Sequence, residues 1–506
     1  MATDTAKPPC PKPERITIAG TLNMPRMLNG LWQLAGGHDT DIDIHTAADA
    51  IDGLVDLGLD GFDMADHYGE AELVVGVYNK RSAGPTTAFT KWCPPESGDK
   101  SLEQAEVAVS RALTRMGLRQ IQLMQYHCWD YTDDTYLFNL NHLQKMKTEG
   151  KIAHIGLTNV DTAHLELLIN SGIEIATNQV SCSVLDLRLV RGRIASVCAE
   201  HGVGVLAYGT LLGGFLSEKW LHAEEPKDLE SLNWSLRKYL RFIRAAGGWQ
   251  PFQVLLQVLS IVSKKHHVSI AAVATRWVLD IPIVSAVIVG CRLNDQSREY
   301  GMKNLAAFGF ELDDEDRKRI SDAQAELDDI PGDCGDEYRR QPFLTAAGDL
   351  SHHIRGSDKI REIDALLETQ RRLEYSSGSK WESIAGYCRA VRVGDCIHVS
   401  GTTATPPAGL IGQSGAIGGN SARSQTVAVL DMIFKAIKEL GGQPRHIVRT
   451  RVMLRDEDDV QQVSEAHGWA FKCEGIRPAN TLTLAGLIGA EFLVEIEAEA
   501  VVINMV

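Results

Sequence analysis

Apolar residues follow two alternating patterns over the first 330 residues. A short apolar run, a polar turn and a segment with apolar residues at three- and four-residue steps recur eight times. The short runs are typical of buried strands, and the longer segments are typical of amphipathic helices. Strands that alternate with helices require a parallel sheet, and eight units favour a closed (β/α)8 TIM barrel over an open sheet. The predicted strands are 27–32, 61–63, 86–91, 121–126, 151–157, 174–179, 203–208 and 283–289, and the predicted helices include 46–57, 102–116, 137–147, 162–169, 187–200 and 316–327.

A different pattern begins after residue 380. Alternating apolar residues predict a hairpin at 387–393 and 396–400, strands at 446–454, 481–484 and 492–502, and helices at 422–440 and 460–471. Two helices on one antiparallel sheet define an α+β domain. A chain of 506 residues is also too long for one core. We therefore predict a barrel domain at 1–340, a charged, helix-containing linker with a flexible end at 341–379, and a second domain at 380–506.

Polar side chains stand where the predicted barrel strands end. In such barrels the carboxyl ends of the strands meet at one rim, which carries the catalytic groups. Lysine, histidine and tyrosine are unusual in tight turns, so their presence here is informative. Tyr68 follows the second strand by five residues and joins the same candidate site. The residues at the eight strand ends are Trp32, Asp63, Lys91, His127, Asn159, Gln179, Tyr208 and Gly290.

Composition narrows the classes of partner. The formal net charge of −15 opposes binding to nucleic acid or to an anionic membrane. No apolar run approaches the length of a membrane-spanning helix, and the first 15 residues lack a signal-peptide pattern. Ten scattered cysteines without a C-x-x-C pair oppose a zinc site or a disulfide framework. We expect a cytosolic protein whose partner is a small molecule.

The sequences around four strand ends resemble those of the aldo-keto reductase superfamily. Asp63 and Tyr68 lie in Asp-Met-Ala-Asp-His-Tyr-Gly, Lys91 in Thr-Lys-Trp, and His127 in Gln-Tyr-His-Cys-Trp. The resemblance spans the predicted barrel. It continues through Gly156-Leu157-Thr158-Asn159, Asn178-Gln179, Ala207-Tyr208-Gly209 and Val287-Ile288-Val289-Gly290-Cys291-Arg292. It implies a (β/α)8 barrel that reduces an aldehyde or ketone, with NADPH as the usual cofactor and these four residues as the catalytic tetrad.

The chemistry of a carbonyl reductase can be assigned to this tetrad. A hydride must reach carbon and a proton must reach the developing alkoxide, yet a phenol is a weak acid at neutral pH. An ammonium group favours the phenolate form, which is the role given to Lys91 beside Tyr68. Asp63 would pair with Lys91, and His127 would donate to the carbonyl oxygen. This mechanism needs no metal. Read singly, Asp63 is equally well a helix cap, Lys91 a solvated charge and His127 a core residue.

The resemblance also suggests where the cofactor lies. Tyr208 would cover the nicotinamide, and Asn159 and Gln179 would bind its carboxamide. Residues 209–248 are predicted to form an ordered functional loop, and amides of its Gly209–Gly214 stretch would approach a phosphate. Arg292 and Gln296 stand where the family holds the 2'-phosphate, and the adenine side falls on Glu299–Tyr300 or on Lys303–Asn304, depending on the counting. The full set of cofactor contacts is Trp32, Asn159, Gln179, Tyr208, Gly209, Leu211, Gly213, Gly290, Arg292, Gln296 and Asn304, and Trp32, Trp129 and Trp249 are candidates for the substrate pocket or for core packing.

Residues 380–506 resemble the YjgF/RidA family through Val391–Asp395, Val399–Gly401, Gln425–Thr426 and Val494–Ala498. The resemblance implies an α+β, chorismate-mutase-like fold, assembly into trimers, and a ligand cleft between subunits. Many members hydrolyse imines with an arginine. Here that position falls on Asn480, and Arg477 lies three residues earlier. Asn480 and Glu495 are the candidate cleft residues, and we predict an oligomerising or ligand-binding role.

Three functions remain open from the sequence. The first is an NADPH-dependent carbonyl reductase assembled as a trimer or a multiple of three by its C-terminal domain. The second is a bifunctional enzyme whose C-terminal cleft deaminates an imine. The third is a slow, NADPH-binding regulatory subunit.

Overall fold

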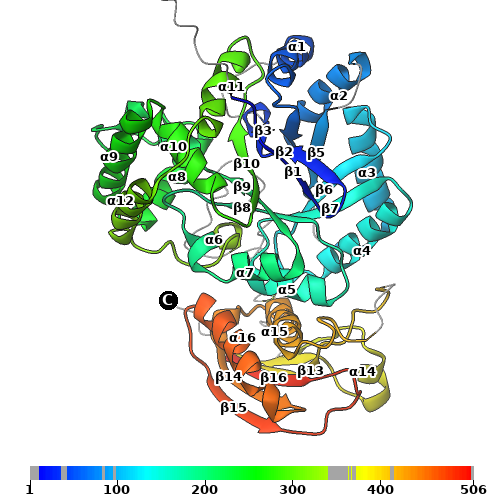
Figure 1. The fold of residues 1–506 in the computed structure, drawn as a ribbon. Coiled ribbons are helices and arrows are strands. Elements are labelled where there is room, and N and C mark those ends of the chain that lie inside the picture. Colours follow the sequence, from blue (N-terminus) through cyan, green and yellow to red (C-terminus); the bar gives the residue numbers. More distant parts are fainter. Residues whose placement is uncertain are drawn as a thin grey trace, which may run out of the picture.

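Eight parallel strands close into a barrel in the order β10-β3-β4-β5-β6-β7-β8-β9, which confirms the predicted fold (Figure 1). The computed structural model describes residues 11–35, 43–82, 86–94, 98–339, 372–410 and 415–502, together with positions 363 and 366. Each predicted strand agrees with an observed one to within a few residues. The barrel strands are β3 (Met27–Gly30), β4 (Gly61–Asp63), β5 (Thr87–Trp92), β6 (Ile121–His127), β7 (Ile152–Thr158), β8 (Thr177–Ser181), β9 (Gly204–Tyr208) and β10 (Val284–Gly290).

Helices surround the barrel, and half of those described begin at a side-chain cap. Asp43, Ser101 and Asp161 each accept a hydrogen bond from the backbone amide three residues later, which satisfies a free donor of the first turn. The predicted helix 187–200 is two helices, because Gly192 is extended between them. The helices are α1 (Ile44–Val55), α2 (Ala71–Arg81), α3 (Leu102–Met116), α4 (Thr135–Thr148), α5 (Thr162–Asn170), α6 (Arg188–Arg191), α7 (Ile194–His201), α8 (Trp234–Ala245), α9 (Trp249–His266), α10 (Ile270–Leu279), α11 (Ser297–Leu305) and α12 (Asp314–Ala325).

Two features of the barrel differ from the sequence prediction. The long loop predicted at 209–248 contains α8, which packs over the carboxyl end of the barrel. A hairpin of β1 (Arg15–Ile18) and β2 (Leu22–Pro25) precedes the first barrel strand. Leu22 and Met24 of this hairpin are buried against barrel-interior residues such as Phe89. The hairpin therefore closes the end of the barrel opposite to the catalytic rim.

The C-terminal domain is one six-stranded sheet in the order β11-β12-β13-β16-β14-β15. Its strands are antiparallel except for β14 and β15, which pair in parallel because α16 connects them as a crossover. Strand β11 lies inside the predicted linker, and Ser376 and Ser377 bind the Glu382 side chain where we predicted a flexible end. Residues 340–362, 364, 365 and 367–371 lie outside the described residues, so the helix predicted in the linker is seen only at positions 363 and 366, which are helical. The elements are β11 (Arg372–Tyr375), α14 (Lys380–Ala385), β12 (Ala390–Val393), β13 (Cys396–Thr403), α15 (Ala422–Glu439), β14 (Ile447–Leu454), α16 (Val460–Cys473), β15 (Ala479–Leu484) and β16 (Val494–Val501).

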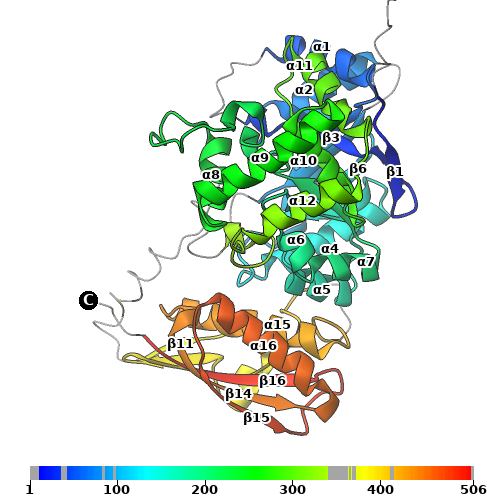
Figure 2. The same cartoon turned by 60° about the vertical axis from the view of Figure 1, so that its left-hand side comes forward.

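Helices α15 and α16 lie between the sheet and the barrel, so the other face of the sheet points away from the barrel (Figures 1 and 2). Helix α15 packs on α5. Ion pairs join the domains: Lys435 to Asp134 at 2.7 Å and Lys438 to Asp130 at 3.1 Å. Among the described residues, no helix is long and apolar enough to cross a bilayer.

Candidate active site

A buried ion pair lies at the carboxyl end of β4 and β5. The Lys91 ammonium is 2.5 Å from an Asp63 carboxylate oxygen and also donates to the Met64 carbonyl at 2.8 Å. Both side chains are almost fully buried. A buried ammonium without a partner would be very unfavourable, so the Asp63 carboxylate compensates the burial of the Lys91 side chain.

Two glutamines from other strands of the barrel hold Asp63. The amides of Gln125 in β6 and Gln179 in β8 donate to its second carboxylate oxygen at 2.9 and 2.8 Å. Gln179 also donates to Gln125 at 2.7 Å. The Gln179 amide nitrogen therefore donates to Asp63 and Gln125, while the residue also lines the cavity at the rim, and its contact with a nicotinamide carboxamide stays a prediction. Gln125 was missed, although a glutamine within an otherwise apolar strand is a recognisable signal.

Tyr68 stands beside this ion pair at the barrel mouth. The Lys91 ammonium lies 4.9 Å from the centre of the Tyr68 ring. Trp32 packs on the same phenol with ring centres 5.0 Å apart. Tyr68, Lys91 and Trp32 line a cavity of about 130 Å³ at the rim of the barrel, together with His127 and Trp129. The structure thus brings the predicted tetrad together, with Asp63 directly behind Lys91. Trp249 instead packs against Phe215 and Phe252.

His127 is held as a neutral ring. Burial and the positive charge of Arg339 bring the pKa of His127 well below its usual value, although the Thr158 carbonyl opposes this shift. Nδ1 lies 3.2 Å from that carbonyl, which can only accept, so Nδ1 carries the proton. Nε2 is buried and has no hydrogen-bond partner in the described part of the chain. In this tautomer Nε2 accepts a hydrogen bond, whereas the sequence suggested that His127 donates one.

Asn159 and Tyr208 lie next to each other at the ends of β7 and β9. The Tyr208 hydroxyl donates to the Asn159 side-chain oxygen at 2.7 Å. Asn159 has a φ of 57°, in the left-handed region that asparagine tolerates better than most residues. Such a conformation at a strand end is typical of functional sites. Both residues line the cavity, as predicted cofactor contacts should.

The glycines after β9 have a packing explanation. Gly209 and Gly213 have φ values of 74° and 66°. A side chain on Gly209 would lie 2.4 Å from the Tyr239 hydroxyl, and one on Gly213 would lie 3.0 Å from the Ser235 backbone. These glycines, with Leu211 between them, therefore let α8 approach the loop closely. The sequence had attributed them to a phosphate.

The residues expected to bind the cofactor phosphate lie after β10. Gly290 ends the strand, Arg292 is exposed, and Gln296 immediately precedes α11. Asn304 is at the other end of α11, roughly 12 Å from Gln296 along the axis at 1.5 Å per residue. Arg292 and Gln296 can thus act on one group, and Asn304 is separate from them.

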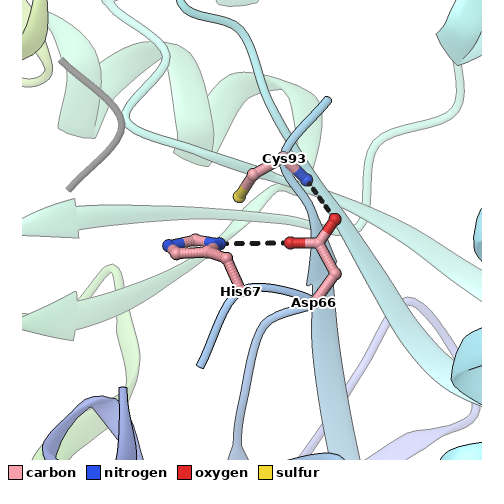
Figure 3. A group of neighbouring side chains, drawn as sticks. All are labelled: Asp66, His67 and Cys93. Atoms are coloured by element: carbon pink, nitrogen blue, oxygen red, sulfur yellow. Dashed lines mark hydrogen bonds and ion pairs between the residues drawn. The ribbon is translucent and has the colours of Figure 1, made fainter. Parts of the chain in front are cut away.

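Three potential metal ligands, Asp66, His67 and Cys93, lie close to one another (Figure 3). One ligand atom from each of Asp66, His67 and Cys93 lies within 4.8 Å of the other two. The two Asp66 carboxylate oxygens are already used, since one lies 3.1 Å from His67 Nδ1 and the other accepts the Cys93 amide at 3.0 Å. The bond from Cys93 joins the turn after β4, which carries Tyr68, to the end of β5, which carries Lys91.

The candidate cleft residues of the C-terminal domain do not meet within one chain. Asn480 accepts a hydrogen bond from Thr450, which is buried and also bonds His467 of α16. Asn480 therefore faces the helices. Glu495 alternates with the buried Val494 and Ile496, so it lies on the opposite face of the sheet.

Sequence reasoning missed several further residues of the cavity, among them Lys238 and Tyr338. Lys238 belongs to α8, which was predicted as loop although its apolar residues follow a helical period. Tyr338 lies beyond the last barrel helix, in a stretch that gave no sequence signal for a return to the rim.

The fold and the site define an oxidoreductase barrel. A model of the aldo/keto reductase family matches residues 26–325, more than half of the chain, and the chain belongs to this family. A model described as endoribonuclease L-PSP matches residues 378–502, which confirms the YjgF-like second domain. The joined arrangement is therefore a carbonyl-reductase barrel followed by a YjgF-family domain.

Individual relatives match one domain or part of one. The NADH-specific methylglyoxal reductase of Escherichia coli K12 is 25% identical over 58% of this chain and 93% of its own. Flagellar radial spoke protein 5 of Chlamydomonas reinhardtii is 33% identical over 32% of this chain, but the match spans only 33% of that protein. An uncharacterized protein of Streptomyces coelicolor is 37% identical over 26% of this chain and 92% of its own. Among solved structures, a glycerol dehydrogenase from Gluconobacter oxydans is 23% identical with a TM-score of 0.50, over 63% of this chain and 97% of its own.

Proposed function

We propose that this protein reduces a small aldehyde or ketone with NADPH, with Tyr68 as the proton donor. The observation that carries this proposal is the Lys91 ammonium, which lies between the Asp63 carboxylate and the Tyr68 ring at the edge of a cavity. A fixed positive charge beside the phenol favours the phenolate, and so makes the phenol a better proton donor. Family membership supports the same reaction class.

The proposed steps follow from the geometry. A nicotinamide bound beside Asn159 and Tyr208 would supply the hydride for the carbonyl carbon, and the Tyr68 hydroxyl would give its proton to the carbonyl oxygen. His127, with its free Nε2 at the cavity, accepts a hydrogen bond from the hydroxyl group of the alcohol product, or of Tyr68, and so orients it. Asp63, held by two glutamines, compensates the burial of the Lys91 side chain.

We propose NADPH over NADH because of Arg292. This guanidinium is exposed after β10, and no ion-pair partner for it exists among the described residues. A planar guanidinium is well suited to a 2'-phosphate. The relative from Escherichia coli is NADH-specific by name, so the choice has to be tested on this chain.

We further propose that the C-terminal domain assembles the protein into a trimer or a multiple of three. The sheet has one face covered by α15 and α16 and one face that points away from the barrel. At one end of this sheet Leu484 is 55% exposed and Ile488 is 90% exposed, which is unusual for large apolar side chains.

The experiment that tests the function is a screen of short aldehydes and ketones against the full chain, monitored by loss of NADPH absorbance. Turnover of at least one carbonyl compound is the expected result. Tight NADPH binding with almost no turnover across the panel would contradict an enzyme and favour the regulatory subunit.

A further inference from the structure

The segment after α12 returns to the barrel and is fixed at the catalytic rim. Glu337 forms an ion pair with Arg188 at 2.7 Å, and both are buried. Asp333 accepts the Thr162 amide at 2.9 Å, and Arg339 donates to the Asn159 carbonyl at 2.5 Å. These contacts hold residues 333–339 on three different elements. The segment is therefore a permanent part of the site.

Tyr338 in this segment forms a wall of the catalytic cavity. Its side chain is buried, and its ring centre lies 5.4 Å from that of His127 and 6.3 Å from that of Trp129. Its hydroxyl oxygen lies 3.5 Å from that of Tyr208. Because its neighbours on the chain are anchored, the position of this hydroxyl is set by the fold.

Lys238 of α8 completes this wall. Its ammonium donates to the Tyr338 hydroxyl at 2.5 Å. The same ammonium lies 4.7 Å from the Tyr338 ring centre and 5.1 Å from that of Tyr208. Aromatic faces attract a cation without neutralising it. Lys238 thus brings a positive charge to the cavity that also contains Tyr68 and His127.

The charges near the cavity are arranged so that a carboxylate can be accepted. Lys91 is already paired with Asp63, and the described residues that line the cavity include no carboxylate. Burial raises the pKa of Glu337, but the Arg188 guanidinium and, to a smaller extent, Lys238 outweigh it and lower that pKa. Glu337 has one oxygen on Arg188 and the other 3.3 Å from the Tyr208 hydroxyl, and it is buried and is not among the described residues that line the cavity.

We propose that Lys238 and Tyr338 bind a carboxylate of the substrate, and that the substrate is therefore a small oxo acid in place of a neutral carbonyl compound. An ammonium and a phenol hydroxyl are both donors, and bonds from them to a carboxylate are of the strong, charge-assisted kind. This inference rests on the proposed carbonyl reduction. The same two donors would also suit a phosphate of the cofactor, and the test separates the two sources.

The test compares glyoxylate with glyoxal, which share a two-carbon aldehyde skeleton and differ in the carboxylate. We expect the full chain to have the higher kcat/KM for glyoxylate. Lys238→Met should lower the ratio of the two kcat/KM values by roughly 10- to 100-fold, mostly through KM, as for loss of a hydrogen bond to a charged group. Tyr338→Phe should lower this ratio less than Lys238→Met does, and Lys238→Arg should retain part of the preference for glyoxylate. Lys219→Met removes an ammonium that lies over Trp220, outside the cavity, and should leave the ratio unchanged.

Other outcomes overturn the inference in distinguishable ways. If Lys238→Met reduces glyoxal and its ratio of kcat/KM for glyoxylate to kcat/KM for glyoxal is unchanged, carboxylate recognition by Lys238 is refuted. The proposed reductase activity would still hold. A loss of NADPH affinity in Lys238→Met, measured by fluorescence titration with the ratio unchanged, would assign the wall to a cofactor phosphate. Failure to reduce either aldehyde or any other carbonyl compound would refute the reductase itself. Circular dichroism verifies that each variant is folded, and Tyr338→Phe replaces Lys238→Met if the latter is not.

Discussion

The barrel and the C-terminal sheet use their polar residues in opposite ways. In the barrel, Asp63, Lys91 and His127 come from three strands and converge on one cavity within a single chain. In the C-terminal domain, Asn480 and Glu495 lie on opposite faces of the sheet, and Arg451 pairs across the outer face with Glu497 and Glu499. A closed sheet brings distant strand ends to one rim, whereas an open sheet leaves a face that only another molecule can cover. We therefore expect catalysis to depend on single residues of the barrel, and assembly to depend on the exposed end of the sheet.

The largest effect is expected for Tyr68→Phe. Loss of the proton donor should lower kcat for carbonyl reduction by about 10²- to 10⁴-fold, the usual contribution of general acid catalysis. NADPH affinity by fluorescence titration should change little, because the ring remains. Full activity in this variant would remove Tyr68 from the mechanism.

Asp63→Asn should destabilise the barrel. It leaves the Lys91 ammonium buried without a charged partner, which costs about 3–5 kcal/mol of unfolding free energy. The matched control is Asp60→Asn, which breaks a partly exposed ion pair with Arg15 and should cost no more than about 1 kcal/mol. Urea denaturation measures both. Equal effects of the two substitutions would show that Asp63 is not the partner on which Lys91 depends.

The boundary between the two domains should respond to pH through His164. Burial opposes a charge on this ring, but the carboxylates of Asp161 and Asp431 outweigh burial and raise the pKa of His164 to about 9. Asp431 belongs to α15 and lies 2.9 Å from His164 Nε2. Because the folded pKa exceeds the unfolded value of 6.5, the stabilisation is complete below pH 6.5 and is lost as pH rises toward 9.

His164→Asn should therefore have a smaller free energy of unfolding than the parent. This loss should be about 3 kcal/mol larger at pH 6 than at pH 9.5. Thermal or urea unfolding at several pH values measures this difference. His201→Asn, at an exposed position, is the control and should show no such change with pH. A pH-independent difference for His164→Asn would mean that this ring is not protonated in the folded protein.

The smallest effect on catalysis is expected for Ile488→Asp, which tests assembly. We expect the subunit count by light scattering to fall from a multiple of three, while kcat/KM changes by less than about twofold because the barrel is untouched. Val107→Asp places the same charge on an exposed apolar position of α3 and should not change the count. If the parent protein is a monomer, or if the variant has the same subunit count as the parent, assembly through this end of the sheet is refuted.

The sequence determined the barrel and the members of the tetrad. Alternation of strand and helix patterns is a local property of the sequence. It predicted the eight strands, most helices, and the rim at which the strands that carry Asp63, Lys91 and His127 end. Helix α8 was missed because Gly209–Gly214 and the polar residues that follow have the composition of a loop.

Only the tertiary structure decided how these groups are used. The neutral tautomer of His127 depends on the Thr158 carbonyl of the next strand, and the orientation of Gln179 depends on Asp63. Tyr338 reaches the cavity from 211 residues beyond His127, held by Arg188 and Glu337. Such contacts join residues that are far apart in the chain, and the period of an apolar pattern contains no information about them.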